Sequence, residues 1–189
     1  MVYVGSASRA TEIVCADPDQ GTWATLLEHV SSDPTAMLTV VSRRPERYAA
    51  DLPPGVRVDR DDETLMSLRA VTPVAPRRIE PTGYDLDRED DGERVTIRLV
   101  SDGRVAAEGT AGLLADGAVY DMVETTPGFR RRGLAGWVMT ELGRTMAERG
   151  ATTALLVATA EGRALYRSLG WVDVAPVRSL VGTAAGQAY

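Results

Sequence analysis

The sequence has no lysine or asparagine, and only one cysteine and one histidine in 189 residues. The single cysteine, Cys15, excludes an internal disulfide, and we expect it to be a small buried hydrophobe. His29 and Cys15 cannot form a zinc site without several converging carboxylates, so no metal is expected. A Gly-x-Ser-x-Gly turn is also missing, which argues against a serine or cysteine hydrolase. We expect His29 to cap or line a helix.

Long apolar runs are missing too. A membrane-spanning helix needs roughly 18 such residues, whereas the longest run here, 151–160, is short and contains three threonines. Residues 1–5 are not a basic stretch followed by an apolar one, so no signal peptide is predicted. The sequence therefore predicts a cytoplasmic protein with no membrane partner.

All the basic residues are arginines, and their balance with acids is uneven. Residues 1–90 hold 10 arginines and 16 acids, whereas residues 91–189 hold 11 of each, so the net charge is −6. A nucleic-acid-binding protein should be basic, and we expect no nucleic-acid partner. The acidic half could attract a cationic amine, although a solvated surface explains the same bias.

The first half of the chain predicts a mixed α/β structure without naming a chemistry. Its prolines predict a turn at 52–55 and a linker at 72–76. Apolar spacing and acid placement predict two helices, at 21–30 and 61–71. Buried strands are expected at 36–41 and 56–58, and the polar stretch 85–93 reads as an exposed loop.

After residue 93 the pattern is sharper. Alternating residues predict an antiparallel meander of strands at 94–100, 105–114 and 118–125, joined by turns at 101–104 and 115–117. The period then changes to that of a helix over 134–146, ended by Gly150. A strand at 153–158, a short helix at 161–169 and strands at 171–174 and 177–181 complete the expected order.

The segment 123–136 joins a strand to this helix through Pro127, Gly128 and three arginines. Amides at a helix N-terminus have no intrahelical partner, and the helix dipole adds positive charge there, so a phosphate group is favoured. The arginines alone could be a nucleic-acid patch or an ordinary surface run. A dinucleotide site is disfavoured because the Gly-x-Gly-x-x-Gly spacing is missing and the strands form a meander.

A second motif, Leu165-Tyr166-x-x-Leu169-Gly170-Trp171, follows about 30 residues later. Together with Pro127-x-x-Arg130-x-x-Gly133-x-Ala135 it resembles the GNAT superfamily of N-acetyltransferases over residues 94–181. The resemblance implies an α/β (α+β) fold: a mixed, mostly antiparallel central sheet with helices on both faces, whose strands part at the acyl-CoA site. Residues 91–189 would be the acetyl-CoA-binding core, and residues 1–90 an N-terminal α/β portion on the acceptor side.

The resemblance also implies a set of contacts with acetyl-CoA, the expected co-substrate. Backbone groups of two strand residues would pair with the pantetheine amides, and the amides after Arg130 would hold the pyrophosphate. The expected contacts are Val123, Thr125, Arg130, Arg131, Arg132, Gly133, Leu134, Ala135, Gly136 and Thr159. Relatives often carry Asn at the last of these positions, and a hydroxyl replaces only part of an amide's hydrogen bonding.

An amine must lose a proton before it attacks a thioester, because its ordinary pKa is about 10. Glu124 is the first candidate for the base, with Asp121 and Glu108 as alternatives; an ion pair with a loop arginine would explain Glu124 equally well. Tyr166 would point its hydroxyl at the sulfur, unless it is a core tyrosine bonded to a backbone carbonyl. The sequence thus predicts an acetyltransferase acting on a primary amine in a ternary complex, with a homodimer as an option. The alternative is a GNAT-fold sensor or assembly module that binds acyl-CoA without chemistry.

Overall fold

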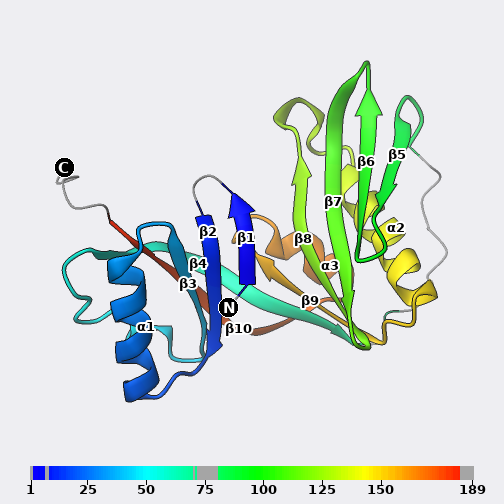
Figure 1. The fold of residues 1–189 in the computed structure, drawn as a ribbon. Coiled ribbons are helices and arrows are strands. Elements are labelled where there is room, and N and C mark those ends of the chain that lie inside the picture. Colours follow the sequence, from blue (N-terminus) through cyan, green and yellow to red (C-terminus); the bar gives the residue numbers. More distant parts are fainter. Residues whose placement is uncertain (1, 7–8, 70, 72–80, 184–189) are drawn as a thin grey trace. The chain divides into compact units, whose positions relative to one another are not determined.

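The computed structural model describes residues 2–6, 9–69, 71 and 81–183, with side chains from residue 11 onward (Figure 1). Strands and helices alternate in the first half, a meander follows, and the motif-bearing elements come last. The elements are β1 (Val2–Ser6), β2 (Arg9–Ala16), α1 (Gln20–Ser32), β3 (Ala36–Val41), η1 (Pro45–Tyr48), β4 (Val56–Arg69), β5 (Asp85–Asp90), β6 (Arg94–Ser101), β7 (Arg104–Leu114), β8 (Gly117–Thr125), η2 (Pro127–Phe129), α2 (Leu134–Glu148), β9 (Thr153–Ala158), α3 (Arg163–Ser168) and β10 (Val172–Gly182).

The described strands are hydrogen-bonded in the order β1-β2-β3-β10-β4-β9-β8-β7-β6-β5. Pairing is antiparallel for β1–β2, β3–β10 and the β5–β8 meander, and parallel for β2–β3 and β8–β9. The predicted mixed, mostly antiparallel sheet is therefore confirmed. Each parallel pair is joined by a helix, α1 in the first case and α2 in the second, because parallel neighbours need a crossover connection.

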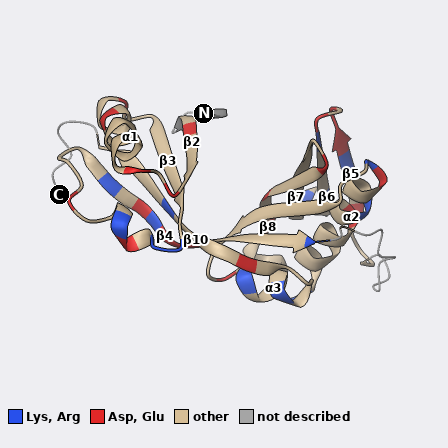
Figure 2. Ribbon diagram, turned by 90° about the horizontal axis from the view of Figure 1, so that it is seen from below, with Lys and Arg blue, Asp and Glu red and all other residues tan. Residues whose placement is uncertain are grey.

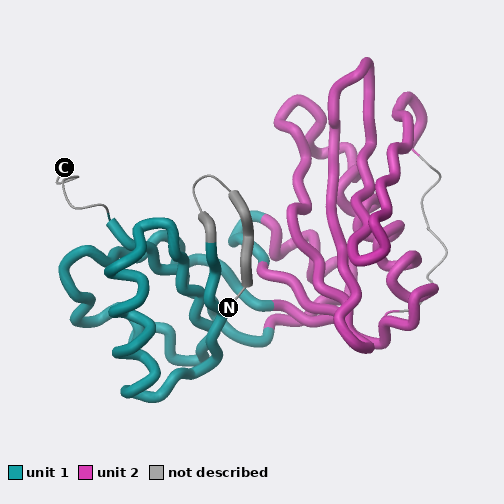
Figure 3. The backbone as a smooth tube through the Cα atoms, viewed as in Figure 1, with its two compact units in different colours: residues 1–65, 158–161, 174–189 teal, residues 66–157, 162–173 magenta. Residues whose placement is uncertain are grey.

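The chain divides into two compact units (Figure 3). Unit 1 comprises residues 1–65, 158–161 and 174–189, and unit 2 comprises residues 66–157 and 162–173. Both units are discontinuous in sequence because β4 and β10 each contribute residues to both. The division into 1–90 and 91–189 expected from the sequence stays a prediction.

The core of unit 1 lies between α1 and the strands β3 and β10. Its buried cluster includes Leu27 and Val30 of α1, Leu38 of β3 and Leu180 of β10. The α1 helix begins at Asp19, whose carboxylate accepts a hydrogen bond from the Thr22 amide at 2.8 Å. In this unit β10 closes the sheet by pairing antiparallel with β3, from Val177↔Val41 to Val181↔Met37.

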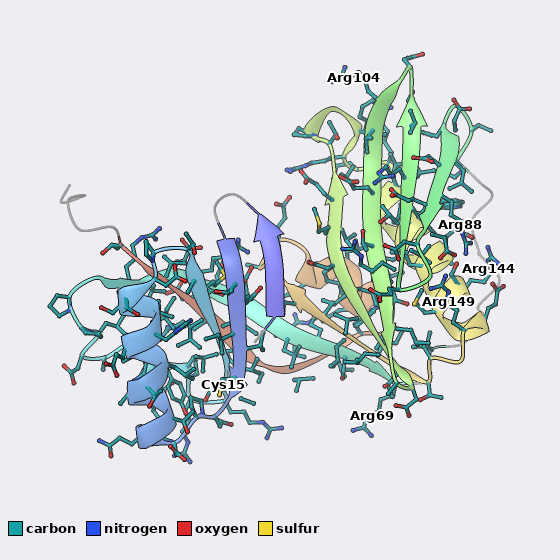
Figure 4. All side chains as sticks on the ribbon, in the orientation of Figure 1. Cys15, Arg69, Arg88, Arg104, Arg144 and Arg149 are labelled. Carbon is teal, nitrogen blue, oxygen red and sulfur yellow. The ribbon has the colours of Figure 1, made fainter. Side chains whose placement is uncertain are left out.

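Unit 2 is built on the β5–β8 meander, against which α2 packs. The contact is close at Gly109 of β7, where a Cβ atom would lie 2.9 Å from Val138 Cγ1, so only glycine lets the helix approach this strand. Arginines of β5 and α2 lie beside one another here (Figure 4). Arg149 binds Asp90 at 2.5 Å, and Arg88 donates to Thr145 at 3.2 Å. These contacts fasten the edge strand β5 to α2.

One predicted helix is a strand. Residues 61–71 were expected to be helical, but β4 runs through Val56–Arg69 and absorbs the short strand expected at 56–58. Its neighbours in the sheet are β10 and β9. Two-sided strand pairing outweighs the weak helical signal of three acids at the start of the segment, as tertiary context often does.

Two further predictions need correction. The expected loop at 85–93 contains the strand β5, a wholly exposed edge strand whose charges made it resemble a loop. The strands expected at 171–174 and 177–181 are one strand, β10. The helix at 21–30 and the strands and helices expected between 94 and 169 are confirmed, within a few residues at their ends. The linker predicted at 72–76 lies outside the described residues.

The single cysteine and the single histidine lie in unit 1. Cys15 is a free cysteine on β2 and is half-buried, not fully buried as expected. His29 lies in the last turn of α1, as predicted, and its backbone carbonyl accepts the bond from Asp33 that ends the helix.

Candidate functional site

The parallel pair of unit 2 separates before its strands end. The ladder joins Gly117↔Thr153 through Tyr120↔Leu156. Beyond that point β8 continues to Thr125 and β9 to Ala158 without further paired residues. The parting of strands predicted from the sequence is therefore present. Val123, Glu124 and Thr125 lie on the part of β8 that no longer pairs with β9, although β8 still pairs with β7 there.

An irregular residue marks the point of separation. Met122 has a positive φ of 52°, and the register with β7 shifts between Glu108 and Thr110. A bulge of this kind bends the strand and re-aims the residues after it. Left-handed backbone is strained for a side chain such as methionine, and strain of this kind concentrates at functional sites. The bulge thus turns β8 away from β9 at the residue after Asp121.

The loop between β8 and α2 presents a run of unpaired amides. Among the described residues, the backbone N–H groups of residues 131–136 have no hydrogen-bond acceptor, and the first amide bonded at this end is that of Trp137, to Gly133. No side chain caps α2, and its first turn contains no acid. Arg131 and Gly133 both have positive φ values, 65° and 78°. Left-handed residues can gather successive amides into an anion-binding concavity.

The loop itself is held by bonds that leave these amides available. Thr126 donates from its amide to Ala106 at 3.0 Å and from its hydroxyl to Val105 at 2.8 Å. Arg130 donates from Nε to the Thr125 carbonyl at 3.2 Å. The loop is therefore preorganised by its own first half and by β7, a condition for strong anion binding.

A cluster that the motif did not reveal surrounds Phe129. Arg132 lies 5.3 Å and Arg104 lies 6.0 Å from its ring centroid, and the Tyr84 ring meets it edge-on at 6.1 Å. Arg132 also donates to the Tyr84 hydroxyl at 3.2 Å and to the Gly128 carbonyl at 3.1 Å. Figure 4 places Arg104 at the tip of the β6–β7 hairpin. No motif indicated Arg104, because the hairpin lies more than 20 positions before the loop.

The Leu-Tyr-x-x-Leu-Gly-Trp motif is a helix terminus. Gly170 has a φ of 89°, its amide donates to Arg167 at 3.1 Å, and the Trp171 amide donates to Tyr166 at 3.1 Å. These two bonds form a Schellman motif, which requires a left-handed residue and commonly brings a hydrophobic contact with it. That contact is between the Tyr166 and Trp171 rings, whose centroids lie 6.3 Å apart. The motif therefore fixes the ring of Tyr166.

The start of β10 anchors the same helix. Two basic residues of α3, Arg163 and Arg167 (basic residues are blue in Figure 2), both bind the carboxylate of Asp173. Together the two arginines lower the pKa of that carboxyl, Arg167 most strongly. Tyr166 is thus held from both ends of its short helix.

Tyr166 is buried, yet its hydroxyl is not used in the core. Within the described part of the chain it has no hydrogen-bond partner, and it does not count among the fully enclosed unpaired atoms. This differs from a core tyrosine bonded to a backbone carbonyl. Burial, and secondarily the charge of Asp121, raises the pKa of Tyr166. The hydroxyl therefore stays protonated at neutral pH and can donate.

The three candidate carboxylates have different surroundings. Glu124 is exposed and forms no ion pair with the described residues, so the alternative of an ion pair with a loop arginine is not observed. It lies opposite Glu108, which binds Arg98 at 3.3 Å. Asp121 accepts a bond from the Met122 amide at 2.8 Å. Of the three, Asp121 is the one whose charge acts on Tyr166.

The predicted contact residues are unequally placed. Val123, Thr125 and residues 130–136 all lie in unit 2, on β8, on the loop that follows it and in the first turn of α2. Thr159 comes directly after β9 and belongs to the short segment of unit 1 at 158–161. Its role in binding stays a prediction.

Neither a metal site nor a membrane-spanning helix is evident among the residues described here. They contain no group of three or more histidine, cysteine or acidic side chains arranged to hold a metal ion. They also contain no helix that is both long and apolar enough to cross a bilayer.

Comparison with known proteins identifies relatives of similar fold. A family model described as "FR47-like protein" matches residues 104–177, from β7 into β10. No curated protein matches the chain. Among solved structures, a GCN5-related N-acetyltransferase from Kribbella flavida is 15% identical with a TM-score of 0.67, covering 93% of this chain and 82% of that one.

Two other solved structures extend the likeness. A GNAT-family protein from Novosphingobium aromaticivorans is 22% identical with a TM-score of 0.60, over 87% of this chain and 82% of its own. A tandem GNAT protein from the clavulanic acid biosynthesis pathway is 15% identical with a TM-score of 0.60, over 85% and 68%. The fold is thus that of proteins named as acetyltransferases. More particularly, the chain has the GNAT fold that its sequence predicted, and the FR47-like model covers the part of the chain that carries both motifs.

Proposed function

We propose that this protein is an N-acetyltransferase that takes its acetyl group from acetyl-CoA and passes it to a primary amine. The observation that carries the proposal is the run of unpaired amides at residues 131–136, next to a strand pair that parts after Tyr120 and Leu156. The amides and the α2 dipole would bind the pyrophosphate. The unpaired edge of β8 would bind the pantetheine arm like an added strand.

The loop arginines would support the same ligand. Arg131, Arg132 and Arg104 have no carboxylate partner within the described residues, although the chain is acidic overall. Guanidinium groups bind phosphate oxygens strongly and in a defined geometry. The Phe129 ring would keep two of these arginines in place through cation–π contact.

Acetyl-CoA supplies the activated acyl group, and the chain's own residues would handle the protons and the charge. A carboxylate beside the parted strands, Glu124 or Asp121, would take the proton of the attacking amine, directly or through water. A backbone N–H of β8 beyond Glu124 would stabilise the negative charge that develops on the carbonyl oxygen. Tyr166 would donate its proton, or a hydrogen bond, to the departing sulfur.

Replacing single groups separates binding from chemistry. Tyr166→Phe should lower kcat by about a hundredfold, the usual scale of a lost proton donor, while the Kd for CoA changes little. Glu124→Gln and Asp121→Asn should identify the base by the same measurement, and Glu108→Gln serves as the comparison. Turnover is measured as free-thiol release with a panel of amines.

The alternative function is an acyl-CoA sensor or assembly module without chemistry. It shares the cofactor site and predicts CoA binding with no thiol release from the unmodified protein on any amine. Failure of CoA to bind at millimolar concentration would contradict both functions.

A further inference from the structure

Unit 1 contains a hollow of about 470 Å³ at the carboxyl ends of its parallel strands β2 and β3. The lining residues come from the loop before α1 and from the segment that follows β3; they are Asp17, Pro18, Asp19, Arg43, Arg44, Arg47 and Tyr48. In open α/β sheets ligands bind outside the carboxyl ends of parallel strands. The volume is also within the range of small-molecule sites. We call this feature the β2–β3 hollow.

The walls of the β2–β3 hollow are tied together. The Ser42 hydroxyl donates to Asp17 at 2.6 Å, and the Asp17 amide donates to Val41 at 3.1 Å. Tyr48 is buried, donates its hydroxyl to the Pro18 carbonyl at 3.0 Å and meets the Trp23 ring edge-on at 5.0 Å. The two segments therefore form a preorganised frame.

The arginines of the hollow have unused binding capacity. Arg43, Arg44 and Arg47 are exposed and form no ion pair with any described carboxylate; the contact of Arg47 is with the Tyr48 ring, at 6.0 Å. Other arginines of unit 1 are paired: Arg57 with Asp59 at 3.1 Å, and Arg60 with Glu63 at 3.0 Å. Three unpaired guanidinium groups thus border one concavity in the acidic half of the chain.

The two acids of the hollow form no ion pair with these arginines. Asp17 accepts the Ser42 hydroxyl, and Asp19 accepts the Thr22 amide as the N-cap of α1. Both carboxylates are thereby directed to the frame. Three guanidinium groups offer more donors than a single carboxylate can accept, and their planar geometry suits phosphate oxygens.

We propose that the β2–β3 hollow binds the phosphate group of a small phosphorylated molecule through Arg43, Arg44 and Arg47. This site lies wholly within unit 1 and shares no residue with the proposed acetyl-CoA site.

Inorganic pyrophosphate is a suitable probe, and amide NMR shifts of the full chain show where it binds. We expect shifts at residues 17–19 and 42–48, in addition to those at residues 130–136. In the double variant Arg44→Gln/Arg47→Gln, the pyrophosphate affinity reported by the first set of shifts should fall at least tenfold. The affinity reported by residues 130–136 should stay unchanged. Arg57→Gln, which removes an exposed but paired arginine of the same unit, should leave both sets unchanged.

Absence of pyrophosphate-dependent shifts at 17–19 and 42–48 in the unmodified protein would overturn the proposal, as would an equal loss in the Arg57→Gln control. Repeating the titration with saturating CoA separates the two sites. Shifts confined to residues 130–136 would contradict the β2–β3 hollow and leave the proposed acetyltransferase intact.

Discussion

The molecule contains two parallel strand pairs, each joined by a helix, and they end in opposite ways. In unit 1, β2 and β3 stay paired along their length, from Thr11↔Ala36 to Ala16↔Val41, and the Asp19 carboxylate caps α1. In unit 2, β8 and β9 part after four residue pairs, and α2 begins at Gly133 without a capping side chain. The same strand–helix–strand arrangement is closed in one case and open in the other.

The difference shows which hydrogen bonds a loop must leave unmade if it is to bind an anion. A capped helix N-terminus is more stable but has already satisfied the amides that an anion would use. A fully paired strand likewise offers no edge to an extended ligand. Unit 2 forgoes both kinds of stabilisation at one place, and that place coincides with the sequence motif.

The largest expected effect concerns the packing of the closed unit. A Cβ atom on Gly182 of β10 would clash with the Val30 carbonyl oxygen and would lie 3.0 Å from that of Asp33. Because backbone atoms cannot rotate away, Gly182→Ala should lower the free energy of unfolding by roughly 3 kcal/mol or more, measured by urea denaturation. Gly109→Ala in unit 2 meets the mobile tips of Val138 and Leu142 and should lose only about 1–2 kcal/mol. Equal losses of unfolding free energy in the two variants would show that the two units are packed equally closely at these glycines.

An acidic residue at the uncapped N-terminus of α2 should make it resemble the capped N-terminus of α1. Gly133→Asp places a negative charge where the pyrophosphate would bind, and we expect CoA affinity to fall about a hundredfold, or roughly 2.8 kcal/mol. Asparagine tolerates the left-handed backbone equally well, so Gly133→Asn isolates the charge and should lose much less. Calorimetric titration with CoA measures both variants. Similar losses in the two would attribute the effect to shape.

The smallest effect belongs to the existing cap. Asp19→Ala removes the bond to the Thr22 amide and should lower the melting temperature by a few degrees, whereas Asp19→Asn should retain the cap. Hydrogen bonds from Thr22 lower the pKa of Asp19 in the folded protein. Its stabilisation is therefore complete above the ordinary aspartate pKa and is lost as the pH falls through the lower folded value.

This pH dependence can be checked by thermal melting between neutral and strongly acidic pH. The difference in melting temperature between the unmodified protein and Asp19→Asn should change only at the acidic end. A difference that changes near neutral pH would mean that another group is responsible.

The second half of the fold could be predicted because its local signals agree. Alternation, turn residues and a 3.6-residue period all indicate the elements from 94 to 169, and Gly170 marks a helix end that the Schellman bonds of Trp171 confirm. The strand β4 could not be predicted, because its acids favoured a helix and its strand neighbours lie far away in sequence. A charged edge strand such as β5 likewise looks like a loop.

The candidate site could likewise be predicted where its residues are close in sequence, and not where they come from distant parts of the chain. The run 130–136 is local, so its unpaired amides followed from the position of the helix start. The cluster around Phe129 was missed because Arg104 and Tyr84 come from separate parts of the chain. The arginines of the β2–β3 hollow were also missed, because no spacing rule connects them with Asp17.

The pairing of β10 with β3 has a consequence for how the chain is made. Unit 1 contains the early strands β1 to β3, yet β10, which pairs with β3, is synthesised only after nearly all of unit 2. The edge of β3 that β10 will cover must therefore stay exposed, or be bound by a chaperone, while unit 2 is synthesised. A nascent chain stalled before Val177 would expose Leu38 and Val40 at a naked sheet edge and invite aggregation.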